Sequence, residues 1–277
     1  MCFKLIVDSC CELTPDLKDK PLNAAAVPLL MTVDNQTFVD NESLDVDGFI
    51  RKMNEFNGKT TSACPSPQAF NEQFEDGKTN FVVTISSQLS GSFSSASVAK
   101  DIALESGKDV HVFDSKSASA GELLVSLKIK ELVEQKLDKA EIINAVEEFI
   151  SGMKTFFVLE NLDNLLKNGR MSKLAVKLTT LLGIRPILGS DGNGNIALFS
   201  KARGAAASIE QLCKTIGEYC TNTGDKILAI THCNNEAQAA RLKAMAEEMY
   251  TFKEIIIEKT RGLSSMYANN GGIIIAF

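Results

Sequence analysis

Residues 85–96 read ISSQLSGSFSSA, a stretch with six serines, one glycine and no charged side chain. The stretch begins where an apolar run, residues 81–85, ends, and this run predicts a buried strand. It leads into residues 94–106, whose pattern predicts a helix. In an open α/β sheet, ligands bind beyond the carboxyl ends of such strands. Hydroxyls and free backbone amides at a helix N-terminus bind an anion without adding positive charge. The stretch therefore predicts an open α/β sheet with a polar cradle for an anion.

Three other loops of the first half, residues 8–10, 60–66 and 114–117, also carry small hydroxyl side chains. Any one of these serines is also explained as a helix N-cap. Capping needs one hydroxyl, however, and the loop near residue 90 offers several. Taken together, the loops favour a binding site over simple capping.

Strands and helices alternate through the first half of the chain. Apolar strands separated by helices predict a mainly parallel sheet covered on both faces. The predicted strands are 3–7, 25–31, 81–85 and 110–113, and the predicted helices are 15–18, 46–57, 67–74, 94–106, 118–135 and 139–151.

The second half mixes a hairpin with helices. Residues 186–188 and 196–199 flank a Gly/Asn-rich turn, which predicts a β-hairpin and hence a mixed sheet. Further strands are predicted at 156–159, 227–230, 254–257 and 272–277, and helices at 161–167, 173–182, 205–219 and 236–250. We predict an α/β protein of two domains: residues 1–153 with an α/β/α core, and residues 154–277 with a mixed sheet.

Composition excludes several classes of function. The formal net charge of −6 argues against nucleic acid as a partner. The N-terminus has no secretory signal pattern, and no apolar run reaches the roughly 18 residues of a membrane span. The seven scattered cysteines form no C-x-x-C pair and favour reduced thiols. We therefore expect a cytoplasmic protein with at most transient membrane contact.

Catalytic patterns are weak. The sequence has no Walker loop, no G-x-G-x-x-G, no G-x-S-x-G and no metal-ligand spacing, so we expect no metal and no cofactor. Of the two histidines, His111 alternates within a strand, whereas His232 ends one. Arg170 and Arg203 each follow a predicted helix or hairpin, and each is either a surface residue or an anion contact. An anion cradle without a nucleophile, base or metal favours binding over catalysis.

Several short motifs, in their order and spacing, resemble the DegV family of fatty-acid-binding proteins. The resemblance covers the whole chain. The motifs are Val7–Ser9 with Leu13, Val27–Leu29, Thr61–Ser62 with Pro65, Leu89–Ser92 with Ser95–Ala96, Phe113–Lys116, Gly169–Arg170 and Ile275–Phe277.

The resemblance implies a long-chain fatty acid buried between two α/β domains. It places the carboxylate contacts on Thr61 and Ser62 and on the turn Ser90, Gly91 and Ser92. In members that act as fatty acid kinase subunits, the protein presents its ligand to a separate kinase, which makes the acyl phosphate. Arg170 and Arg203 match positions associated there with the phosphate or the kinase. The resemblance thus implies a lipid carrier rather than an enzyme.

One segment departs from the family pattern. Relatives usually carry a histidine near the carboxylate, but here Tyr267 occupies that position and Asn270 replaces a proline. A phenol still donates a hydrogen bond, but it is not cationic. We therefore expect Tyr267 to contact the carboxylate without charge.

The tail wall and the exact role are less determined. Candidates for the wall are Phe93, Leu178, Leu181, Leu182 and Ile184, which ordinary core packing explains equally well. An alternative function is a phosphotransfer or small carbonyl-binding enzyme subunit related to the dihydroxyacetone kinase substrate domain, with His232 as the substrate-binding residue. A lipid sensor that regulates a partner is a third possibility.

Overall fold

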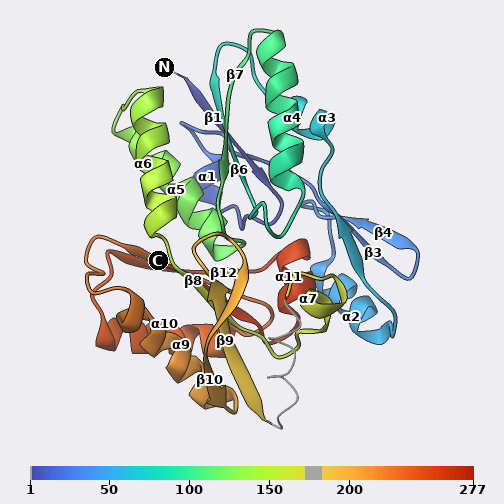
Figure 1. The fold of residues 1–277 in the computed structure, drawn as a ribbon, viewed down its shortest axis with the longest axis vertical. Helices are drawn as coiled ribbons and strands as arrows, with labels where there is room; N and C mark the ends of the chain where they lie inside the picture. Colours follow the sequence, from blue (N-terminus) through green and yellow to red (C-terminus); the bar gives the residue numbers. More distant parts are fainter. Residues whose placement is uncertain (1, 172–182) are drawn as a thin grey trace.

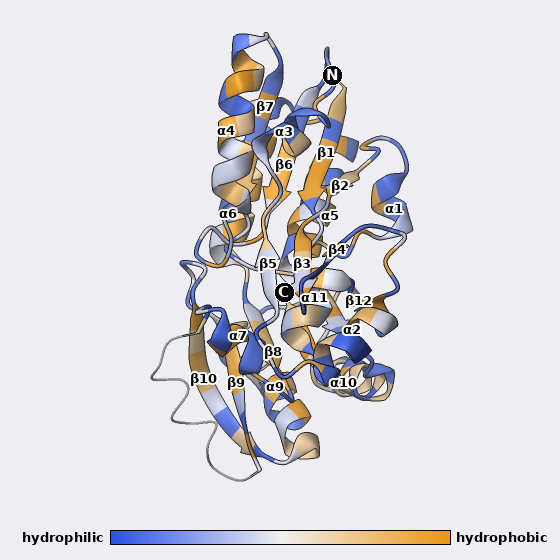
Figure 2. Ribbon diagram, turned by 90° about the vertical axis from the view of Figure 1, so that its right-hand side faces the viewer, coloured by the Kyte–Doolittle hydropathy of each residue, from blue (hydrophilic) through white to orange (hydrophobic). Residues whose placement is uncertain are grey.

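The computed structural model describes residues 2–171 and 183–277. Its first sheet is parallel and has the order β2-β1-β6-β7. The strands are β1 (Phe3–Asp8), β2 (Ala25–Val27), β6 (Thr79–Thr84) and β7 (Asp109–Asp114). Figure 2 shows orange, hydrophobic stretches in β1 and β6, as expected for a sheet buried on both faces.

The two faces of this sheet are covered by different helices (Figure 1). Ile6 and Val82 pack against helix α4 (Ser92–Glu105), whereas Leu5 and Phe81 pack toward α5 (Ala120–Glu134) and α6 (Lys139–Gly152). Side chains alternate between faces along a strand, so neighbouring residues contribute to opposite layers. The predicted α/β/α arrangement is confirmed. Two short helices, α1 (Pro15–Lys18) and α3 (Pro67–Asn71), complete this half.

A small antiparallel sheet, order β4-β3-β5, was not predicted. It consists of β3 (Leu30–Val33), β4 (Gln36–Val39) and β5 (Thr61–Ala63), and helix α2 (Val46–Glu55) lies between β4 and β5 in the chain. The prediction of one strand over 25–31 was wrong. Pro28 lacks an N–H, and the Leu29 N–H is bound by the Ser9 hydroxyl at 3.0 Å, so β2 and β3 join different sheets.

The second half is built on a six-stranded mixed sheet, as predicted, with the order β10-β9-β8-β13-β11-β12. Only the pair β11–β12 is parallel. The strands are β8 (Thr155–Val158), β9 (Ile184–Ser190), β10 (Ile196–Arg203), β11 (Ile227–His232), β12 (Glu254–Lys259) and β13 (Ile273–Ala276). Helices α9 (Ala205–Tyr219) and α10 (Glu236–Met249) pack on one face of it. The helix predicted over 173–182 lies outside the described residues.

Two short helices lie where the halves meet, α7 (Asp163–Lys167) and α11 (Gly262–Ala268), and α11 was not predicted. They join a core cluster that draws on both halves, with Leu29 and Phe49 from the first and Leu165 and Met266 from the second. The domain boundary after residue 153 stays a prediction, since α6 ends at Gly152 and β8 begins at Thr155.

Candidate ligand-binding cavity

A cavity lies between the two halves and encloses about 760 Å³ of empty space, counting its opening. Its wall is largely apolar and comes from both halves of the chain. The apolar lining includes Ile85, Leu89, Phe157, Leu159, Leu165, Ile196 and Ile274.

Strand β8 runs along the cavity. Thr155 and Phe157 of β8 and Leu159 directly after it are alternate residues, and all three line the cavity, as expected for extended chain. Gly189 on β9 also lines the wall, and a side chain there would collide with the Thr155 carbonyl and the Phe156 ring. The close approach of β8 and β9 therefore depends on a glycine at this position.

Two of the loops predicted to bind an anion, residues 60–66 and 85–92, meet near one end of the cavity. The Ser62 hydroxyl lies 3.1 Å from the Tyr267 hydroxyl, which joins β5 to α11. Asn168 donates from Nδ2 to the Thr60 carbonyl at 2.9 Å, and Arg170 donates from Nε to the Leu89 carbonyl at 3.1 Å. We call this end, at which Arg170 and Tyr267 line the cavity, the mouth.

The serine turn at residues 90–92 begins α4. The Ser90 and Ser92 hydroxyls are 3.1 Å apart, and the Ser92 N–H donates to Ser90 Oγ at 3.2 Å. Gly91 lies so close to Cys64 that an added Cβ would be 3.0 Å from the sulfur. Ser92 is fully buried, whereas Thr61 and Gly91 are exposed. Small side chains thus bring the loop of β5 against the start of α4.

Buried carboxyl groups lie in and near the loop that follows β1. Asp8 accepts from the N–H groups of Ile85 and Cys10, both at 3.0 Å, yet burial raises its pKa to about 6. Glu12 accepts from the Ser119 hydroxyl and the Arg261 N–H, and burial raises its pKa to about 8.

Glu122 belongs to the same buried group. Its side chain is fully buried, and its oxygens have no hydrogen-bond partner among the described residues. Burial, with Asp8 as a further cause, raises its pKa well above the ordinary value. Sequence reasoning missed Glu12 and Glu122, because an acidic residue in a loop or a helix looks the same in the sequence whether it is buried or solvated.

Other predicted residues lie away from the cavity. Phe93 packs with Ala69 on the α4 face of the first sheet. Arg203 is exposed, and its partner in the β10–β9 register is Ile184. Ile184 is six residues, roughly 20 Å, along β9 from Ser190, which lines the cavity. The predicted wall residues Leu178, Leu181 and Leu182 lie outside the described residues.

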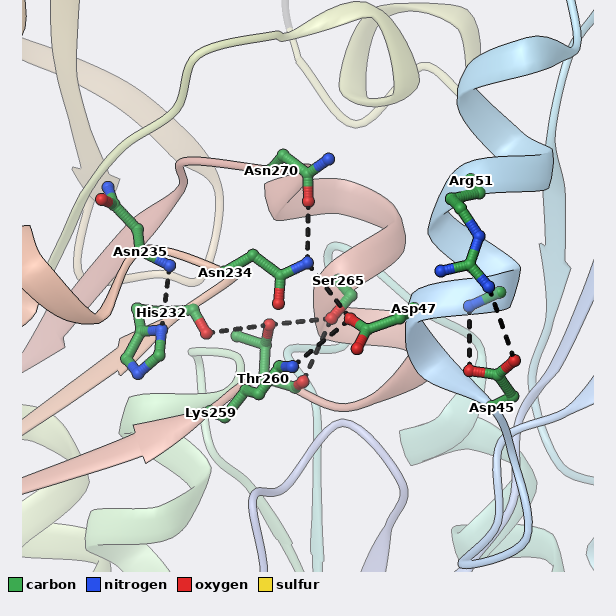
Figure 3. A network of polar contacts seen from close by, with 11 residues as sticks. Asp45, Asp47, Arg51, His232, Asn234, Asn235, Lys259, Thr260, Ser265 and Asn270 are labelled. Atoms are coloured by element: carbon green, nitrogen blue, oxygen red, sulfur yellow. Dashed lines mark hydrogen bonds and ion pairs between the residues drawn. The ribbon is translucent and has the colours of Figure 1, made fainter.

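His232 belongs to a separate polar network, shown in Figure 3. Its Nδ1 accepts from the Asn235 N–H at 3.2 Å, and its carbonyl accepts from the Thr260 hydroxyl. The ring is 4 % exposed, burial lowers its pKa, and it is not part of the cavity wall. The network ends at the surface, where Asp47 accepts from Asn234 and Lys259. These contacts give His232 a structural role and do not favour the carbonyl-binding alternative.

Within 2–171 and 183–277, no group of three or more His, Cys, Asp or Glu side chains is placed to hold a metal ion. In the same part of the chain, no helix combines the length and the apolar character needed to cross a bilayer.

Comparison with known proteins gives a consistent result. A family model described as "Uncharacterised protein, DegV family" matches residues 2–277. A DegV domain-containing protein of Streptococcus pneumoniae is 36% identical over 281 residues, covering 100% of this chain and 99% of the relative.

Two solved structures have the same fold. A DegV family protein from Ruminococcus gnavus, refined with vaccenic acid, has a TM-score of 0.93 and 37% identity, with 100% of both chains covered. The fatty acid kinase B3 protein of Streptococcus pneumoniae, loaded with linoleic acid, has a TM-score of 0.93 and 35% identity, covering 100% of this chain and 99% of that one. The match over nearly the whole sequence, together with the shared fold, shows that this chain belongs to the DegV family.

Proposed function

We propose that this chain binds one long-chain fatty acid in the cavity and carries it rather than transforming it. The observation that carries the proposal is the cavity itself, which has a largely apolar wall and, at the mouth, the Tyr267 hydroxyl 3.1 Å from that of Ser62. Relatives of the same fold hold vaccenic and linoleic acids. The carboxylate contacts in this proposal are Thr61, Ser62, Ser90, Gly91, Ser92 and Tyr267.

The energetics suit such a ligand. Burial of one methylene is worth about 0.8 kcal/mol, so a sixteen-carbon tail contributes roughly 10 kcal/mol before the costs of association. The head group then needs only enough hydrogen bonds to offset its desolvation. The hydroxyls of the proposed contact residues can donate such bonds.

The proposal extends to a partner. One relative of the same fold is a fatty acid kinase B protein, and this chain would likewise present its ligand to a separate kinase. Arg170, which donates from Nε to the Leu89 carbonyl at the mouth, would contact a phosphate that forms on the carboxylate. Arg203, which is exposed on β10, would contact the kinase rather than the ligand.

The first test is the lipid content of the purified protein. Mass spectrometry after denaturation should detect long-chain acids in a roughly equimolar amount to the chain, because a largely apolar cavity buries most of the surface of such a ligand. Preparations that are consistently empty and that also fail to bind added oleic or palmitic acid would refute the function.

The second test concerns the head group. Thr61→Ala and Ser62→Ala should each weaken fatty acid binding by about 1–3 kcal/mol, because each removes a hydrogen-bond partner of a buried anion. Titration with a fluorescent fatty acid measures the loss. Ser94→Ala, on the exposed side of α4, is the matched control and should bind as the parent does. If both variants bind as tightly as the control, the carboxylate lies elsewhere.

A further inference from the structure

The cavity wall is not apolar throughout. Away from the mouth it includes Ser117 and Thr155, whose hydroxyl oxygens are 2.7 Å apart. Both residues are buried, at 3 % and 6 % exposure. A tunnel for a plain alkyl chain gains nothing from hydroxyls in its wall, since polar groups without partners cost free energy.

The hydrogen bonds of this pair leave one proton without a good acceptor. Two hydroxyls carry two protons, and the bond between them uses one. Ser117 Oγ also lies 3.5 Å from the Ala118 carbonyl, a distance too long for a strong O–H···O bond. No other partner of either hydroxyl occurs among the described residues. An oxygen on the ligand at this point would accept the second proton.

Strand β8 gives the distance of this pair from the mouth. Leu159, directly after β8, packs in the same core cluster as Leu89 and Tyr267 of the mouth, whereas Thr155 lies four residues back along the chain, roughly 13 Å away. An extended alkyl chain advances roughly 1.3 Å per carbon, because its C–C bonds of about 1.5 Å zigzag. A ligand whose carboxylate is at the mouth therefore places its tenth to twelfth carbons, approximately, beside the pair.

We propose that the cavity accepts a fatty acid with a hydroxyl group near mid-chain, bound by the Ser117–Thr155 hydroxyl pair. This inference rests on the proposed fatty acid binding and names the class of acid. The pair donates the free proton to the ligand oxygen, and an oxygen of the pair accepts the ligand's own proton. The hydroxyl of such an acid is then satisfied inside an otherwise apolar wall.

The test compares stearic acid with 12-hydroxystearic acid on the delipidated full-length protein, by calorimetry or displacement of a fluorescent fatty acid. The parent should bind the hydroxy acid at least as tightly as stearic acid. Thr155→Val keeps the side-chain shape but removes the hydroxyl, and it should lower the relative affinity for the hydroxy acid by about three- to tenfold. Ser117→Ala should shift the ratio in the same direction.

Stearic acid binding is the internal control in each variant, so misfolding is not mistaken for lost selectivity. 2-Hydroxystearic acid, with its hydroxyl near the head group, should not respond to Thr155→Val. If the parent binds 12-hydroxystearic acid more than tenfold weaker than stearic acid, or if neither variant moves the ratio, this inference is wrong and the fatty acid function stands. If neither acid binds, both fail.

Discussion

Replacing Asp40 by alanine should lower the free energy of unfolding by about 3 kcal/mol, because three buried donors lose their acceptor. The Asp40 carboxylate accepts from the Ser9 hydroxyl at 2.9 Å and from the N–H groups of Gly262 and Leu263 at 3.0 and 2.8 Å. The residue is 2 % exposed, so water cannot replace these bonds. Denaturation with urea, followed by circular dichroism, measures the change.

The same substitution should weaken fatty acid binding. Gly262 and Leu263 begin α11, the helix that carries Ser264 and Tyr267 to the cavity, and Asp40 caps that helix from the other half of the chain. Loss of the cap frees the helix, so Tyr267 is no longer held opposite Ser62.

The matched control is Asp45→Ala. Asp45 also caps a helix, accepting from the Gly48 N–H at 2.9 Å, but it is exposed, so its loss should cost only about 1 kcal/mol and leave binding unchanged. Equal losses of stability in the two variants would show that burial of the Asp40 contacts contributes nothing.

The dependence of α11 on Asp40 also shows why part of the fold was not predictable. The first sheet is predictable because apolar runs of strand length lie between amphipathic segments. The hairpin of β9 and β10 is predictable because Gly192 and Gly194 mark its turn. Residues 262–268 have no such period. Their helix is fixed by an acceptor more than 200 residues away, which no local pattern records.

The candidate site divides in the same way. Hydroxyl-rich loops at strand ends could be read from the sequence, and the structure brings residue 62 close to Tyr267 as part of one mouth. The residues that line the cavity could not be predicted from the sequence, because Phe157 and Leu159 alternate with their neighbours as core residues of a strand also do. Phe93 illustrates the difficulty: it directly follows the serine turn, yet it packs in the cluster on the α4 face of the first sheet and does not line the cavity.

The buried carboxyls give the second large effect: the free energy of unfolding should fall by several kcal/mol as the pH rises from about 5 to 9. Asp8 has a pKa of about 6 in the folded chain against an ordinary value of 3.8, and Glu12 has one of about 8 against 4.5. Between these pH values the folded chain holds protons that the unfolded chain has released. The stabilisation is therefore fully present below the ordinary pKa and is lost as the pH rises through the pKa of the folded chain. Each pKa unit corresponds to about 1.4 kcal/mol.

Glu122 tests the origin of this slope. Its pKa is also raised by burial, so Glu122→Gln replaces a group that titrates by a neutral one of the same size. The variant should lose less stability than the parent between pH 5 and 9 in urea denaturation series. Glu148→Gln, exposed on α6, is the control and should keep the parent's slope.

Exposed groups with lowered pKa values, such as Glu75 beside Lys4 and Lys78, act only at acid pH and in the opposite direction. Stability that is constant or rises over this range would mean that water reaches the carboxyls, since only desolvation holds their protons in place.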